Sequence, residues 1–236
     1  MALATLEVWH SRPIAPTRRV AVGDCDLPVD PAPGSGGLLL GAVMARYADD
    51  LDGDLRSSML DLMDEVEQGK SIGQPRLRHR LQVDRVGLHR SRHRLLLGPD
   101  GLVFAFETKV SAPAQSALAA VYACASFDDS IRGQVMPVVR RGLEWAGPVG
   151  PGLIDHLVGP DIAMRMRSQE FDLASNPVLW ALQMLEIDSG DLPPAKIVQK
   201  HYRRLVRDAH PDIGGAAPEA ADRLAELARA REILMT

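Results

Sequence analysis

Apolar positions recur at helical spacing in the N-terminal half of the chain. A first helix is predicted to begin at Leu38, because Leu39, Val43 and Tyr47 share one face. A second helix is predicted over about 54–68. Its apolar residues recur at intervals of three and four, and they are Leu55, Met59, Leu62, Met63 and Val66. Both stripes predict helices that bury one side against a core.

The first 37 residues are rich in proline and glycine and end in the run Pro31-Ala-Pro-Gly-Ser-Gly-Gly37. Because these residues favour turns, most of the segment 1–37 is expected to form loop, with one short strand at Arg19–Val22. The glycines at 34–37 precede an apolar helix, as in a phosphate-binding loop, but the lysine of a P-loop is missing. A flexible linker is therefore the favoured interpretation.

Strands and further helices are predicted for the middle of the chain. Alternating residues at Arg80–Asp84 are typical of a half-buried strand. The turn sequence Gly98-Pro-Asp-Gly101 separates two apolar runs and so predicts a β-hairpin over 95–106. Helices are expected at Ala114–Phe127 and Ser130–Trp145, and the internal proline of the second should kink or divide it.

A glycine- and proline-rich run, Ala146-Gly-Pro-Val-Gly-Pro-Gly152, marks the clearest boundary in the chain, with a short helix expected after it at Leu153–Val158. We therefore predict an α+β N-terminal domain followed by an all-α C-terminal domain. The segments are 1–37 (a Pro/Gly-rich segment), 38–150 (the α+β domain), 151–175 (a connector) and 176–236 (the all-α domain).

Three helices are predicted within 176–236. Asn176-Pro177 suits the start of a short first helix, with asparagine as the cap and proline in the first turn. A second helix over about 193–209 has one apolar face, formed by Val198, Tyr202, Leu205 and Ala209. A third begins at Pro218-Glu219, and its apolar side should pack on the second in an antiparallel hairpin.

The second of these helices carries a basic stripe opposite its apolar face. Its residues recur at the same intervals as the apolar ones, but each stands two positions earlier in the sequence. This shift places the stripe roughly 200° around the helix from the apolar face. The residues of the stripe are Lys196, Lys200, Arg203 and Arg207. Arg204 widens the stripe, and no acidic residue falls between 196 and 207. A solvated helix usually mixes its charges to gain intrahelical pairs. The stripe therefore indicates an acidic partner, with an ordinary exposed face as the alternative.

The tripeptide His210-Pro211-Asp212 follows this helix, and Gly214-Gly215 lets the chain turn. The string Tyr202-Arg-Arg-Leu-Val-Arg-Asp-Ala-His-Pro-Asp212 resembles the second helix and loop of the J-domain family of co-chaperones. Residues 180–187 and 223–234 are similar to the first and third helices of that family. The resemblance covers about 60 of the 236 residues, and the flanking helices give the short motif its specificity.

The resemblance implies a module that recruits a 70-kDa heat-shock chaperone and stimulates its ATPase without hydrolysing anything itself. The basic face would dock on an acidic surface of the chaperone's ATPase domain. The positions that match the family there are Lys200, Arg203, Arg204 and Arg207. The contacts that couple docking to hydrolysis would come from His210, Pro211 and Asp212.

The sequence departs from the family pattern at several positions of this module. Ala209 stands where an aromatic residue is common, Asp208 replaces a frequent basic residue, and Arg231 sits where the family often has tyrosine. The short fourth helix of many members has no counterpart within the 236 residues. These changes make the hydrophobic core smaller and reduce the positive charge of the module. They therefore bear on how strongly it would stimulate the ATPase.

Composition and charge limit the remaining possibilities. Hydrophobic residues make up 46% and charged residues 25% of the chain, which suits a globular core. The formal charge of −4 argues against a protein devoted wholly to nucleic acid. No apolar run approaches the roughly 20 residues of a membrane span, and the N-terminus lacks a secretory signal, so the cytoplasm is the expected location. Cys25 and Cys124 are expected to be inert thiols.

Other candidate chemistry is weaker. The segment 76–94 holds seven arginines and three histidines against one acid, Asp84, and so could bind RNA or an acidic protein surface. It has no aromatic residue on which bases could stack, and a solvated strand face is the alternative. Asp50, Asp52 and Asp54 do not match the glycine position of a calcium loop. No metal site, cofactor or catalytic residue is predicted.

The hypothesis from the sequence is a J-domain co-chaperone whose N-terminal domain selects a client protein or a location. One alternative is a module that binds nucleic acid or ribosomes through residues 76–94. Another is an N-terminal enzyme with an accessory J-domain, which a deep pocket with convergent polar groups would favour. No family is recognised in residues 1–170.

Overall fold

The computed structural model describes residues 2–12, 18–73, 78–98, 101–107, 112–166, 177–187, 193–209 and 217–235, without the side chains of Pro177, Leu179 and 217–222. The architecture is mixed α+β, as predicted. The chain forms two units, Ala2–Met166 and Arg167–Thr236. Their boundary lies inside the predicted connector 151–175, because the helix after residue 150 packs into the core of the first unit.

The first unit is built on a five-stranded sheet in the order β3-β2-β1-β4-β5. β2 and β3 run parallel, and the other neighbours run antiparallel. The strands are β1 (Ala2–His10), β2 (Arg18–Asp26), β3 (His79–Leu81), β4 (His89–Gly98) and β5 (Gly101–Phe106). The centre of the sheet therefore comes from the first residues of the chain.

The prediction that residues 1–37 form mostly loop is wrong. Ala4, Leu6 and Val8 are fully buried in β1, so this segment has the period-two pattern of a strand. The strand predicted at Arg19–Val22 is confirmed and is longer. The glycines at 34–37 are not a linker, because they form the first turn of a helix. A Cβ at Gly36 would lie 2.6 Å from the carbonyl carbon of Leu27.

The predicted hairpin and helices of the first unit are confirmed. Gly98 pairs with Gly101 across the turn between β4 and β5. The helices are α1 (Gly34–Tyr47), α2 (Gly53–Glu67), α3 (Pro113–Cys124), α4 (Asp129–Glu144) and α5 (Pro151–Val158). Asp52 caps α2 by accepting a hydrogen bond from the Leu55 amide at 2.8 Å. The apolar stripe predicted for α2 is its buried side.

Pro137 was predicted to kink or divide α4, and the division is wrong, because the helix continues unbroken through this residue. The proline removes the hydrogen bond to the carbonyl of Gly133, four residues earlier. Gly133 is exposed, and water can take the place of the missing donor. The helix therefore tolerates a residue that sequence rules treat as a breaker.

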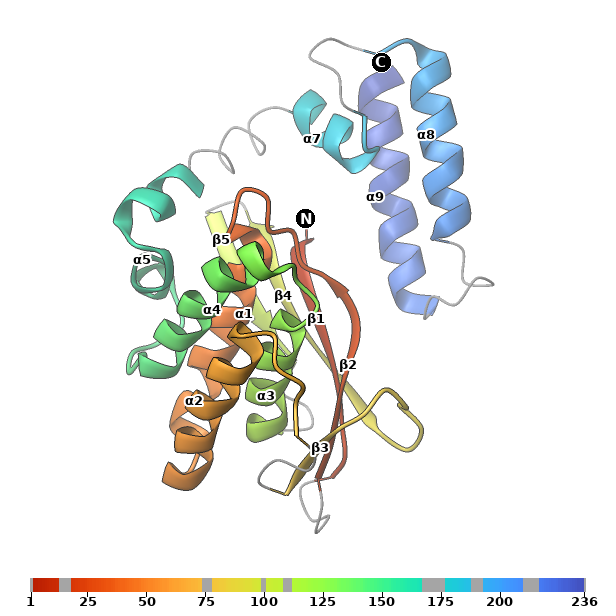
Figure 1. The fold of residues 1–236 in the computed structure, drawn as a ribbon. Coiled ribbons are helices and arrows are strands. Elements are labelled where there is room, and N and C mark those ends of the chain that lie inside the picture. The colour runs from red at the N-terminus through yellow and green to blue at the C-terminus, as the bar shows by residue number, and fades with distance from the viewer. Residues whose placement is uncertain are drawn as a thin grey trace. The chain divides into compact units, whose positions relative to one another are not determined.

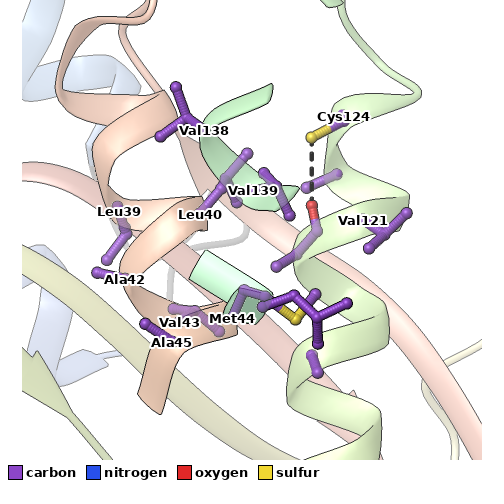
Figure 2. Close-up of a cluster of buried hydrophobic side chains, with 14 of the residues drawn as sticks. Leu39, Leu40, Ala42, Val43, Met44, Ala45, Val121, Cys124, Val138 and Val139 are labelled. Atoms are coloured by element: carbon purple, nitrogen blue, oxygen red, sulfur yellow. Dashed lines mark hydrogen bonds between the residues drawn. The ribbon is translucent and has the colours of Figure 1, made fainter. Parts of the chain in front are cut away.

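The helices of the first unit gather on one side of the sheet (Figure 1). α1 is the centre of their packing, with residues on every side of the helix buried. Val121 and Cys124 of α3 and Val138 and Val139 of α4 belong to the same buried cluster as the side chains of α1 (Figure 2). A helix that is apolar all round is stable only when it is enclosed, so the sheet, α3 and α4 all depend on α1.

Two glycines allow α1 and α4 to cross at close range. A Cβ on Gly142 of α4 would run into the carbonyl oxygen of Gly41 in α1, and a Cβ on Gly41 would lie 2.9 Å from Val138. Backbone atoms make the first of these contacts, so rotamer changes cannot relieve it.

Gly142→Ala should therefore lower the free energy of unfolding by about 3 kcal/mol, because the two helices must move apart. Gly133→Ala is the matched control on the same helix: its Cβ would meet no atom within 4 Å, and alanine should raise stability by about 0.5–1 kcal/mol. Urea unfolding of the full chain measures both. Equal stability of the two variants would contradict this account of the crossing.

The second unit contains α7 (Pro177–Met184), α8 (Ala195–Asp208) and α9 (Ala217–Met235). α8 and α9 lie side by side and antiparallel (Figure 1). The three helices share a small core of their own, whose fully buried members are Ala181, Leu185, Val198, Leu227 and Ala230. Across the described parts of both units, no helix has the length and apolar composition needed to cross a membrane.

Candidate functional site

The apolar and basic stripes of α8 occupy opposite sides of the helix. Val198 and Leu205 are buried in the core of the second unit, with Tyr202 and Ala209 packed against it. The side chains of the predicted basic stripe are all exposed, and they are Lys196, Lys200, Arg203, Arg204 and Arg207. We call these five residues the α8 basic face. Together with Ala195 and Gln199 they line an open hollow on the surface.

The α8 basic face has almost no internal neutralisation. Arg204 lies 2.5 Å from the carboxylate of Glu186, and both side chains are about half exposed. Within the described residues, no carboxylate pairs with the other four cations. Each exposed pair contributes little to folding, so these charges are poorly explained by stability. They leave a concentrated positive field that is available to an acidic partner.

Contacts from α7 and α9 hold α8 in place behind this face. His201 shares a hydrogen bond of 2.9 Å with the carbonyl oxygen of Leu185 through its Nδ1 atom. The guanidinium of Arg231 in α9 lies 5.0 Å from the centre of the Tyr202 ring, a cation–π contact. Arg231 thus packs on the aromatic residue of α8 at a position where the resembled family often has tyrosine.

α8 ends at Asp208, and the amide of Ala209 donates to the carbonyl of Leu205 at 2.9 Å. The three predicted partner-contact residues that follow, His210, Pro211 and Asp212, lie outside the described residues. The structure therefore brings together the predicted basic residues, and the placement of the tripeptide relative to them stays a prediction.

The basic segment 76–94 is divided between two faces of the sheet. His79 and His93 are buried, whereas Arg90, Arg92 and Arg94 occupy the alternate positions of β4. Strand geometry sends alternate side chains to opposite faces, so the histidines and the arginines separate. In the part of the chain that the structure describes, no group of three or more histidine, cysteine, aspartate or glutamate residues is placed to hold a metal ion.

Polar side chains buried in the first unit form the other candidate site. His93 is fully buried between Tyr47 and Phe106, with ring centres 5.7 Å from each. Within the described residues, neither of its ring nitrogens has a hydrogen-bond partner. Next to it, His10 Nε2 shares a hydrogen bond of 2.9 Å with the Ser91 hydroxyl.

These buried groups are held in their neutral forms. Burial, and to a smaller extent the charges of His10 and Arg46, lowers the pKa of His93 to about 4. Burial also raises the pKa of the Cys124 thiol to about 12, which agrees with the prediction of an inert thiol at this position.

The buried His93 ring should make stability depend on pH. Its pKa is about 4 in the folded state and close to 6.5 in the unfolded state, so between these values the unfolded chain binds the extra proton. The contribution of the neutral His93 ring to the free energy of unfolding is therefore fully present above pH 6.5. It is lost as the pH falls to 4, and the total loss is roughly 3 kcal/mol.

His93→Leu should remove this pH-dependent contribution. The free energy of unfolding of the variant should therefore fall less steeply with acidification than that of the wild type. Urea unfolding between pH 7 and pH 4 measures both slopes. Parallel curves would show that His93 is accessible to protons in the folded protein.

The chain matches no protein-family model, no curated protein and no solved structure among those with which it was compared.

Proposed function

We propose that the protein is a J-domain co-chaperone that recruits a 70-kDa heat-shock chaperone and stimulates its ATPase. One observation supports this above the others: the α8 basic face is exposed opposite the core and ends directly before the sequence His210-Pro211-Asp212. The antiparallel pair of α8 and α9, preceded by the shorter α7, also supports the proposal.

The α8 basic face suits a rapid and reversible encounter. Clustered cations attract an acidic surface over about 8–10 Å at physiological salt, so they speed association more than they strengthen the final complex. Because α8 is already folded against α7 and α9, docking need not order the helix. The cost of binding is then largely that of association itself.

The tripeptide supplies a different contribution in this proposal. His210 and Asp212 would contact the chaperone and couple docking to hydrolysis, and Pro211 would restrict the backbone between them. The protein would carry no catalytic residue of its own, since hydrolysis takes place in the chaperone. The first unit would select the client protein or the location.

Neutralising part of the α8 basic face should weaken stimulation. With the variant Arg203→Gln/Arg204→Gln/Arg207→Gln, half-maximal stimulation of the chaperone's ATPase should need about tenfold more protein. The reason is that each of the three removed charges should cost roughly 0.5 kcal/mol of binding free energy. Rising salt should weaken the wild type more steeply than this variant. Steady-state ATP hydrolysis by the chaperone measures both effects.

A triple variant of the first unit, Arg19→Gln/Arg80→Gln/Arg94→Gln, is the charge-matched control and should stimulate like the wild type. Circular dichroism checks that α8 stays folded, as expected for exposed positions opposite Val198 and Leu205. Full stimulation by the α8 variant at every salt concentration would contradict the proposed docking surface.

A further inference from the structure

The sheet of the first unit has a second face, opposite the one that carries the helices. On β1, Leu6 and Val8 belong to the hydrophobic core, and Glu7 and Trp9 alternate with them on the second face. On β4, the buried residues Ser91, His93 and Leu95 alternate with arginines. The sheet arginines of this second face are Arg19 of β2, Arg80 of β3 and Arg90, Arg92 and Arg94 of β4. We call this surface the arginine face.

The strand register brings these arginines together from distant parts of the sequence. Arg19 stands next to Arg80 in the parallel pair of β2 and β3, although like charges side by side are unfavourable. Along β4 the three arginines follow one another at about 7 Å. Arg19, Arg80 and Arg94 have no carboxylate partner among the described residues, so the surplus of positive charge on the face is not cancelled.

A buried carboxylate organises the other arginines. Glu7 is only 3% exposed, and the guanidinium groups of Arg92, Arg90 and Arg85 lie 3.2, 3.6 and 3.8 Å from its oxygens. Arg85, from the loop before β4, also pairs with Asp24 at 3.2 Å. One carboxylate with three arginines holds their side chains across the sheet and leaves the cluster net positive.

Trp9 lies on the same face and supplies the aromatic ring that residues 76–94 lack. It stands between Ala21 of β2 and Arg90 of β4 in the strand register. Its indole N–H donates to Glu7 at 2.6 Å, and Arg85 lies 5.8 Å from its ring centre. A Cβ on Gly23 would lie 2.8 Å from the indole nitrogen, so glycine is needed there for the ring to occupy this position.

We propose that the arginine face binds single-stranded nucleic acid. The sheet arginines present planar forks that match phosphate oxygens, and Trp9 offers a ring on which a base can stack. A positive surface with an interleaved aromatic ring suits an unpaired strand, whose bases are free to turn toward the protein. An acidic peptide would use the charges and leave the ring without a role.

Binding of a short fluorescein-labelled oligouridine to the full chain, followed by fluorescence anisotropy over a range of salt concentrations, tests this proposal. Arg19→Gln/Arg80→Gln/Arg94→Gln should weaken binding at least about tenfold and reduce the magnitude of the salt slope by about 2, since each contact with a single strand contributes about 0.7. The α8 variant Arg203→Gln/Arg204→Gln/Arg207→Gln should bind within about twofold of the wild type.

Trp9 is tested by a pair of variants that both lose its hydrogen bond to Glu7. Trp9→Phe keeps an aromatic ring and should retain most of the affinity, whereas Trp9→Leu should lose about tenfold. Thermal unfolding shows whether each variant is folded, and if Trp9→Leu is not, the arginine variants alone decide the outcome.

Three results would overturn the proposal: no binding by the wild type, an equal loss of affinity in the α8 variant, or competition by polyglutamate as strong as that by unlabelled oligouridine. The last would assign the face to an acidic protein. Because the two triple variants affect different units, a failure of RNA binding leaves the chaperone test of α8 intact.

Discussion

Burial of one side of α8 and of one face of the sheet decides where the charges of this protein gather. In α8, Val198 and Leu205 each gain about 1.5–3 kcal/mol by leaving water, and that orientation turns the cations of the helix outward. In the sheet, the alternation of buried and partly exposed residues sends His93 of β4 to the core and the arginines of β4 to the other face. Both candidate surfaces result from this separation.

The two basic surfaces are organised differently. Among the residues that the structure describes, one carboxylate, that of Glu186, pairs with one of the five cations of α8, so most of their charge is not neutralised. On the sheet, Glu7 is buried beneath three arginines and fixes them in place. The first arrangement suits a fast encounter with a large acidic surface, and the second suits a flexible anionic strand that must adapt to a prepared site. A protein with both could hold one partner while it recruits another.

Local periodicity made part of the fold predictable. The stripe of α2, the turn between Gly98 and Gly101 and the two sides of α8 each depend on residues close together in sequence, and the structure confirms all three. β1 was missed because the prolines and glycines between residues 28 and 37 dominated the composition of a segment that begins with an alternating strand. The burial of α1 on all sides also needs the α3 and α4 contacts of Figure 2, which no local pattern contains.

The two candidate sites also differ in whether local sequence is enough to predict them. The α8 basic face could be read from helical spacing alone. The arginine face could not, because Trp9 and Arg90 are neighbours only through the pairing of β1 with β4. Its central carboxylate, Glu7, looks in the sequence like any polar residue of a strand, and its burial becomes visible only once Arg85, Arg90 and Arg92 are placed around it.

In the proposed function, the second unit couples to a chaperone's ATP hydrolysis through the tripeptide after α8. Asp212→Asn changes this tripeptide alone, because the substitution removes a charge at nearly constant volume. The measurement is single-turnover ATP hydrolysis by a 70-kDa heat-shock chaperone with the full chain. The wild type should accelerate hydrolysis and the variant should not. No acceleration by the wild type, or equal acceleration by both proteins, would contradict the account.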